Sequence, residues 1–486
     1  MSIKRHTAYN VAGAIVPLLV TFVTLPVYLR TIGEERYGVL VILLTLLGYF
    51  GLFDLGLGRA VTNRIAAFRS HTAAEREEVF WTALLMNLAL GSVGALALWG
   101  AGTVVLEYVV EAPGALAAEV QAALPWMVLA FPVLLASSVM SGALMGREEF
   151  LAQNAVQIGA GILIQVVPLM VALTVGPELP ALVVAVIGVR VLSVAALFGL
   201  CVRQLPVGLK PRWARAQVRP LFGFGGWVTV TSVVGPLLST LDRVIIGAVA
   251  GAKAVTYYTV PYSIASRITI IPGSLSSALF PRFSSLGAKE GDALLDTAVR
   301  SLVVVVTPLV VGGLLIMKPF LTWWVGTEFA AKAAPVGEIL VIGLWANCLA
   351  YIPYSMIQGR GRPDLVAKFH LAEVLPYLAV LWLALEWKGA VGAALAWSLR
   401  VWVDAALLYG ATSFSNPRML VSGIAILAGG VGTLALTPGI GWFGLALRTV
   451  VVSTVAAWAW FSAPAQLKMM VTGLIHRFRR TQPAGA

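Results

Sequence analysis

The chain contains 486 residues, of which 59% are hydrophobic and 12% are charged. Soluble globular domains have about 45–50% apolar and about 25% charged residues, and disordered chains have low hydrophobicity, so the composition excludes both classes. The formal net charge is +12. The sequence therefore predicts a basic membrane protein with many spans.

Apolar runs follow one another along the whole chain. A transmembrane helix requires about 20 predominantly apolar residues, and fourteen runs of this kind occur. They are 8–29, 37–61, 79–106, 121–145, 150–175, 180–202, 220–249, 254–280, 298–317, 334–357, 365–385, 390–411, 418–437 and 441–463. No loop between them is long enough to fold alone, so we predict an all-α polytopic membrane protein with about 14 transmembrane helices.

The distribution of Lys and Arg indicates the orientation of these spans. With the N-terminus placed in the cytoplasm, 22 basic residues lie on the inner side and 6 on the outer side, as the positive-inside rule requires. The even number of spans then places both termini in the cytoplasm. Most of the positive charge is thereby assigned to topology and to contact with anionic membrane lipids, so no nucleic-acid partner is expected.

Matched features recur in the two halves of the chain, at offsets between 219 and 208 residues. The pairs are Pro17 with Pro236, Gly33 with Gly251, Arg64 with Arg282, Gly146 with Gly359, Pro168 with Pro376, and Arg190 with Arg400. They indicate an internal repeat of six helices, and an even number makes the two lobes parallel. The predicted divisions are an N-lobe at 1–203, a basic linker at 204–219, a C-lobe at 220–412, two further spans at 413–465 and a basic tail at 466–486.

Motifs of soluble catalysis are missing from the sequence. It contains no G-x-x-x-x-G-K-[ST] phosphate loop, no G-x-S-x-G, no H-E-x-x-H and no Cys/His cluster with metal-ligand spacing. We therefore predict a protein that is not an enzyme and that uses no metal or cofactor.

Charged residues inside the predicted spans are the candidate functional residues. Six are arginines and four are acids: Arg59, Arg190, Arg243, Arg267, Arg400, Arg448, Asp54, Asp242, Glu373 and Asp404. A charge at the centre of a transmembrane helix costs about 2.5–3.5 kcal/mol on insertion scales, so these side chains must face an aqueous cavity or find partners. By its place in the sequence, Arg267 lies near the middle of its span. Arg448 lies near an outer end, where snorkelling explains it.

Structural explanations compete with functional ones for these residues. Arg400 and Asp404 are four residues apart and can pair along one helix face. Asp54 and Arg59 can form a structural pair near a cytoplasmic gate. Glu373 fits either a packed polar contact or a carboxyl that couples transport to protons.

Two short regions resemble a known family. The first contains Gly33, Tyr37-Gly38 and Phe53-Asp54-Leu55-Gly56-Leu57, and the second contains Leu241-Asp242-Arg243-Val244-Ile245-Ile246-Gly247 with Leu279-Phe280-Pro281. Together with the fourteen spans they resemble the bacterial polysaccharide (O-antigen type) flippases of the multidrug/oligosaccharidyl-lipid/polysaccharide exporter superfamily. The similarity covers nearly the whole chain.

This resemblance implies a flippase in the bacterial cytoplasmic membrane. Its substrate would be an undecaprenyl-diphosphate-linked oligosaccharide for O-antigen or exopolysaccharide synthesis, moved by alternating access between the two lobes. Arg190, Arg243, Arg267 and Arg400 would bind the diphosphate, since arginine holds phosphate oxygens two at a time. Asp54, Arg59, Asp242, Glu373 and Asp404 would serve as gate or coupling residues. Spans 13 and 14 would form a groove for the lipid tail, and a polysaccharide polymerase and chain-length machinery would be partners.

Three alternatives stay open from the sequence. A lipid II flippase of peptidoglycan synthesis has the same number of spans. A drug/cation antiporter of the same superfamily is disfavoured by the excess of arginine over acid inside the spans. A membrane-embedded glycan polymerase is disfavoured because the largest predicted outer loops, 107–120 and 318–333, are short.

Overall fold

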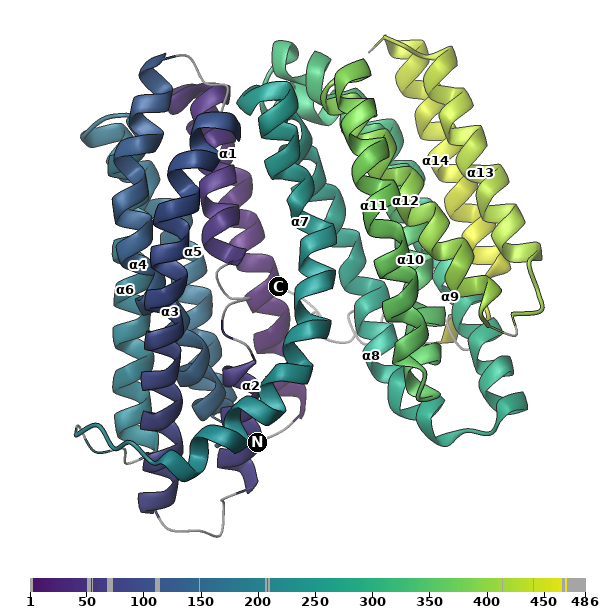
Figure 1. Cartoon of the computed structure of the whole chain (residues 1–486). Helices are drawn as coiled ribbons and strands as arrows, with labels where there is room; N and C mark the ends of the chain where they lie inside the picture. Colours follow the sequence, from purple (N-terminus) through teal and green to yellow (C-terminus); the bar gives the residue numbers. More distant parts are fainter. Residues whose placement is uncertain are drawn as a thin grey trace, which may run out of the picture. The chain divides into compact units, whose positions relative to one another are not determined.

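The computed structural model describes residues 3–49, 54, 56–67, 73–109, 114–147, 149–205, 208, 210–412, 414–439, 441–465 and 468–469. These residues form 14 α-helices and contain no strand (Figure 1). Most of the tail predicted at 466–486 lies outside the described residues. The chain divides into two compact units, Met1–Thr256 and Tyr257–Ala486.

Unit 1 contains six helices and most of a seventh. They are α1 (Ile3–Tyr49), α2 (Leu57–Ala67), α3 (Ala73–Val109), α4 (Gly114–Gly146), α5 (Phe150–Thr174), α6 (Leu179–Gln204) and α7 (Arg215–Ala265), which continues into unit 2. α4 packs against α2, α3 and α6, and α5 packs against α1 and α6. Close approach is possible because small residues lie at the crossings: a Cβ atom at Gly142 of α4 would overlap the backbone of Gly58 in α2.

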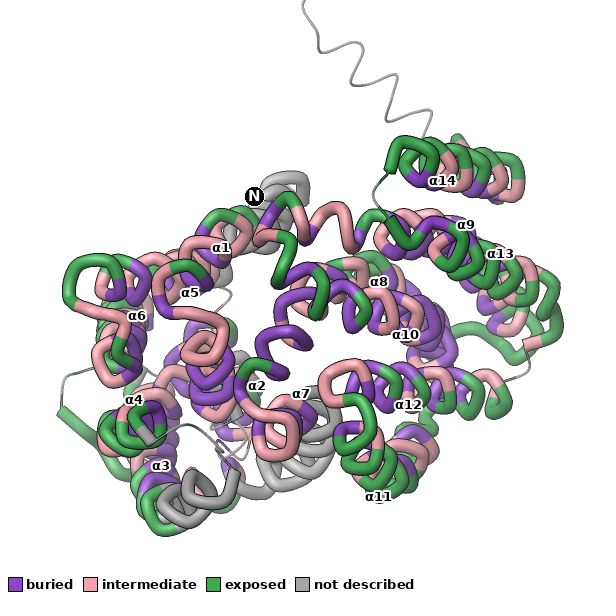
Figure 2. The backbone as a smooth tube through the Cα atoms, turned by 90° about the horizontal axis from the view of Figure 1, so that it is seen from above, coloured by how far each residue is buried: buried purple, intermediate pink, exposed green. Residues whose placement is uncertain are grey.

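Unit 2 contains the end of α7 and the remaining helices. They are a 3-10 turn (Ser266–Thr269), α8 (Ile270–Ser285), α9 (Ala288–Trp324), α10 (Thr327–Gly359), α11 (Pro363–Lys388), α12 (Ala390–Gly410), α13 (Arg418–Leu436) and α14 (Trp442–Ser462). α10 packs against α8, α9, α11 and α12, and Figure 2 shows that buried residues concentrate on it. α13 and α14 pack against α9.

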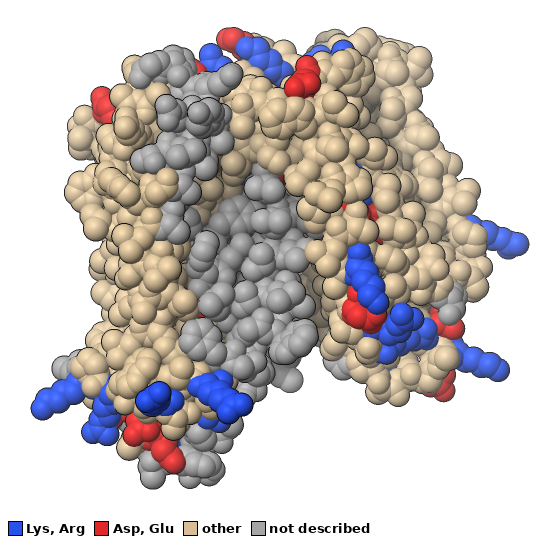
Figure 3. All heavy atoms as spheres, viewed as in Figure 1, with Lys and Arg blue, Asp and Glu red and all other residues tan. Residues whose placement is uncertain are grey.

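The linker after α6 is held against the first third of α3 in unit 1. Trp81 Nε1 donates to Gly208 O at 3.0 Å, and Ala214 N donates to Thr82 Oγ1 at 3.0 Å. Lys210 and Arg212 are exposed, and Figure 3 shows Lys and Arg gathered at this end of unit 1. The boundary between the units falls inside α7 rather than in this linker, and the predicted lobes at 1–203 and 220–412 stay a prediction.

Each predicted span contains helix. Within the described residues, eleven helices are long and apolar enough to cross a membrane. Of the other three predicted runs, 8–29 lies in α1, 37–61 is shared by α1 and α2, and 220–249 lies in α7. The prediction of an all-helical, multi-span membrane protein is therefore confirmed.

The predicted repeat is visible in the backbone of the two halves. α1 is kinked at Gly33 (φ 80°, ψ 164°) and α7 is kinked at Gly251 (φ 81°, ψ 168°). Glycine is required because a side chain clashes with the backbone at such positive φ values. α3 and α9 both have 37 residues, and α4 and α10 both have 33. The matched glycines of the sequence thus mark equivalent corners.

Candidate functional site

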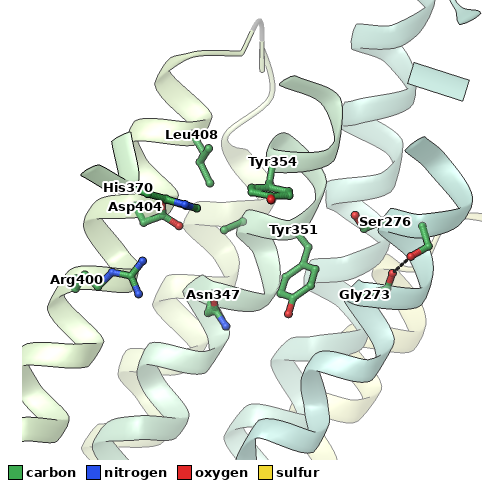
Figure 4. Close-up of a pocket in the computed structure, with 11 residues that line it drawn as sticks. Gly273, Ser276, Asn347, Tyr351, Tyr354, His370, Arg400, Asp404 and Leu408 are labelled. Atoms are coloured by element: carbon green, nitrogen blue, oxygen red, sulfur yellow. Dashed lines mark hydrogen bonds and ion pairs between the residues drawn. The ribbon is translucent and has the colours of Figure 1, made fainter. Parts of the chain in front are cut away.

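A cavity of about 420 Å³ lies within unit 2, between α8, α10, α11 and α12. It is lined mainly by polar and aromatic side chains: Ser276, Ser277, Asn347, Tyr351, Tyr354, His370, Arg400 and Asp404, together with Gly273, Ala350 and Leu408. Figure 4 shows these side chains arranged around one space. The volume is in the range of sites for small molecules, about 300–1,000 Å³.

One ion pair and one histidine–carboxylate contact join α11 to α12 beside this cavity. Arg400 Nε lies 3.1 Å from Glu373 Oε2, and His370 Nε2 lies 3.5 Å from Asp404 Oδ1. The paired residues occur in opposite order along the two helices. This is because α11 and α12 are joined by a tight turn at Gly389 and therefore run antiparallel. The predicted pairing of Arg400 with Asp404 along one helix is thus replaced by pairs across two helices.

Arg400 keeps part of its guanidinium free for a ligand. Its Nε is bonded to Glu373, and among the described residues its two terminal nitrogens have no hydrogen-bond partner. The side chain is 13% exposed, and its guanidinium carbon lies 5.8 Å from the centre of the Tyr377 ring. Figure 4 shows the guanidinium directed into the cavity. This arrangement presents a preoriented pair of donors to an anion.

Arg190 holds the matching position in unit 1. It lies eleven residues after the first residue of α6, while Arg400 lies ten residues after the first residue of α12. Helical periodicity places Arg190 on the buried face of α6, in line with Val183 and Val186. Its Nε is shielded from solvent, and the side chain has no hydrogen-bond or ion-pair partner among the described residues.

Arg243 and Arg267 are not brought together by any described contact. Arg243 belongs to unit 1 and is half-buried beside Asp242, whose Oδ1 accepts the Arg243 backbone N–H at 2.7 Å. Arg267 belongs to unit 2, is exposed, and lies in the 3-10 turn between α7 and α8. Arg267 does not line the 420 Å³ cavity. A single site formed by four arginines therefore stays a prediction.

Asp54 is held by a buried polar cluster in unit 1. It is 9% exposed and accepts hydrogen bonds from Asn87 Nδ2 at 2.8 Å, Ser138 Oγ at 2.6 Å and Gly58 N at 3.1 Å. Arg59 is exposed and interacts with Asp54 electrostatically. Sequence reasoning missed Asn87 and Ser138, although both are polar residues inside otherwise apolar runs.

Arg448 has a structural position that differs from the prediction. Its side chain is 6% exposed, so it does not snorkel to the membrane surface. Nε donates to Thr437 Oγ1 and Nη1 donates to Leu315 O, both at 3.1 Å. These bonds tie α14 to the end of α13 and to α9. The buried guanidinium thus has hydrogen-bond acceptors inside the protein.

Comparison with known proteins identifies the family. Residues 3–287 match the family model described as "Polysaccharide biosynthesis protein". The chain belongs to this polysaccharide biosynthesis family. A similar protein of Shigella flexneri is named "Putative O-antigen transporter". It is 30% identical over 409 residues, and the alignment covers 84% of this chain and 97% of that protein. The Escherichia coli K12 lipopolysaccharide biosynthesis protein WzxC is 22% identical over 203 residues, about 40% of each chain.

Solved structures show the fold that this family member shares. The lipid II flippase MurJ in an inward closed conformation has a TM-score of 0.69 at 12% identity, covering 92% of this chain and 98% of that one. An inward-facing multidrug resistance MATE family transporter has a TM-score of 0.62 at 13% identity, covering 86% and 99%. The resemblance to polysaccharide biosynthesis proteins found in the sequence is confirmed by the family match, and the fold is shared with these two solved structures.

Proposed function

We propose that this protein is a flippase that moves oligosaccharide repeat units, linked to undecaprenyl diphosphate, across the bacterial cytoplasmic membrane. Membership of a polysaccharide biosynthesis family and 30% identity over nearly the full length of the named O-antigen transporter support it. The single structural observation that supports it best is the uncommitted guanidinium edge of Arg400 in a polar cavity at mid-span. Both termini would lie in the cytoplasm.

The chemistry of the site suits a diphosphate. Arg400 would bind phosphate oxygens, and Arg190 would do so from the equivalent place in unit 1, with Arg243 and Arg267 as further donors. Alternating access would expose these groups to one side of the membrane and then to the other. No nucleotide is required, because each negative charge that moves outward gains about 2.3 kcal/mol per 100 mV, and a diphosphate with two charges gains roughly 4–5 kcal/mol.

The acidic residues would adjust this cycle. Glu373 is the counter-ion of Arg400, and Asp404 lies 3.5 Å from His370. Both carboxylates would lie beside the bound phosphate, so a proton or cation would replace part of the charge when the phosphate leaves. Asp242 lies next to Arg243 and would act in the same way. Asp54 and Arg59 would hold the start of α2 in one of the two conformations of the alternating-access cycle. A polysaccharide polymerase and the chain-length machinery would receive the exported unit.

The alternatives differ in observable ways. The two carboxylates beside the cavity also suit a drug/cation antiporter, and the shared fold suits a lipid II flippase. A polymerase with a large outer loop is disfavoured further, because α9 ends at Trp324 and α10 begins at Thr327. Most of the outer loop predicted at 318–333 is therefore helix.

Deletion of the gene in its own host separates these functions. We expect lipid-linked repeat units to accumulate on the inner leaflet, where an added impermeant glycan-modifying enzyme does not reach them. Unpolymerised units on the outer surface would instead indicate a polymerase. Accumulation of peptidoglycan precursor with cell lysis would indicate a lipid II flippase, and unchanged glycan with increased drug sensitivity would indicate an antiporter. A plasmid copy of the wild-type gene is the control.

A further inference from the structure

A second hollow lies on the other side of the helix pair that bounds the polar cavity. It is a groove of about 230 Å³ between α11 and α12, on the surface of unit 2. Its walls are the apolar side chains Pro376 and Val380 of α11 and Leu399, Val403 and Leu407 of α12. Val380, Leu399, Val403 and Leu407 are between 37% and 56% exposed. The groove is therefore open and apolar.

The groove lies at the middle of both helices. Its walls occupy residues 376–380 of a helix that spans Pro363–Lys388, and residues 399–407 of a helix that spans Ala390–Gly410. Both helices are long and apolar enough to cross a membrane. The groove therefore faces the hydrocarbon depth of the bilayer, where only an apolar occupant is stable.

An ion pair forms the floor of this apolar groove. Glu373 and Arg400 both line it, and Arg400 also lines the polar cavity. Glu373 Oε1 is shielded from solvent and has no hydrogen-bond partner among the described residues. One cation is thus shared by a polar cavity on one side of the helix pair and an apolar groove on the other. An amphiphile with an anionic head and a hydrocarbon chain matches these two environments, the head fitting the polar cavity and the chain fitting the apolar groove.

We propose that the groove between α11 and α12 holds the isoprenoid chain of the transported lipid while Arg400 holds its phosphate. This inference rests on the proposed flippase function. When a head group crosses the membrane centre, its chain must leave the protein at the same depth, because the chain stays in hydrocarbon. The groove provides this exit at the depth of Arg400.

The placement differs from the expectation that spans 13 and 14 hold the tail. In the described part of the chain, α13 and α14 pack against α9 and contribute no residue to the polar cavity. A chain bound along α13 and α14 would therefore lie away from Arg400 and the polar cavity. The groove beside Arg400 keeps head and chain of one molecule together.

Binding to the purified full-length protein tests this inference. Val403→Trp and Val380→Trp fill the groove from its two walls, and Leu383→Trp on α11 is the matched control, because Leu383 is 66% exposed and does not line the groove. The probes are undecaprenyl diphosphate and inorganic pyrophosphate, which has the same head and no chain. Thermal unfolding midpoints show that each variant is folded.

The groove variants should bind undecaprenyl diphosphate about tenfold more weakly, because the chain loses roughly ten van der Waals contacts with the groove walls, and they should bind pyrophosphate like the wild type. Arg400→Gln should weaken both probes. Equal binding of undecaprenyl diphosphate by Val403→Trp, Val380→Trp and Leu383→Trp would overturn the inference and show that bulk lipid alone covers the groove. A wild-type protein that binds neither probe would overturn the proposed function as well.

Discussion

Replacement of Arg190 by leucine is expected to make the protein more stable and less able to export glycan. Arg190 is half-buried in α6 and has no partner among the described residues. Leucine removes a charge that costs about 2.5–3.5 kcal/mol at the centre of a transmembrane helix. The midpoint of thermal unfolding should rise by about 2 °C or more. Export should fall about tenfold or more, the value of one hydrogen bond to a charged group.

Arg448→Leu is the matched control for this prediction. Arg448 is also an arginine inside a span, but it donates to Thr437 and to the Leu315 carbonyl. Its replacement leaves these buried acceptors unpaired, so the unfolding midpoint should fall. The opposite signs separate an arginine kept for function from one kept for structure. A lower midpoint for Arg190→Leu would show that Arg190 is structural.

Replacement of Arg400 by glutamine should nearly abolish export. The cavity then loses the guanidinium that we propose binds phosphate, and Glu373 is left as a buried charge without its partner. Breaking a buried pair in this way costs about 3–5 kcal/mol of stability, so the single variant alone does not separate binding from folding. Arg400→Lys keeps the charge but loses the fork, and should retain a small part of the export rate.

The double variant Arg400→Gln with Glu373→Gln resolves the two effects. It removes both charges of the pair and should recover most of the unfolding midpoint that Arg400→Gln loses. Export, measured as surface glycan at equal protein abundance, should stay near zero. If the double variant exports at the wild-type rate, Arg400 serves only to neutralise Glu373.

The fold was predictable from the sequence because its signals are local. Apolar runs of about 20 residues dictate helices in lipid, where every backbone polar group must be bonded within its own segment. Gly33 and Gly251 were predicted as equivalent, and both occupy the same positive-φ corner of a kinked helix. These features depend on neighbouring residues and not on how helices pack.

The contents of the candidate site were harder to predict because partners come from different helices. The sequence spacing predicted that Arg400 pairs with Asp404. In the structure, the packing of α12 against α11 places Arg400 beside Glu373 and Asp404 beside His370. Spacing likewise left Arg448 at the membrane surface, whereas packing of α14 buries it. The hydroxyl and amide groups around Asp54 also come from separate spans. Contacts of this kind are set by packing, which residue spacing does not encode.

The most direct measurement is transport by the purified protein in liposomes. Undecaprenyl-diphosphate-linked oligosaccharide is placed in one leaflet, a membrane potential is applied, and an impermeant enzyme reports how much substrate reaches the other leaflet. Wild-type protein and Leu383→Trp should move the lipid toward the positive side, and Arg190→Leu and Arg400→Gln should not. Accumulation against a gradient without any potential or ion gradient, or equal transport by the arginine variants, would contradict this mechanism.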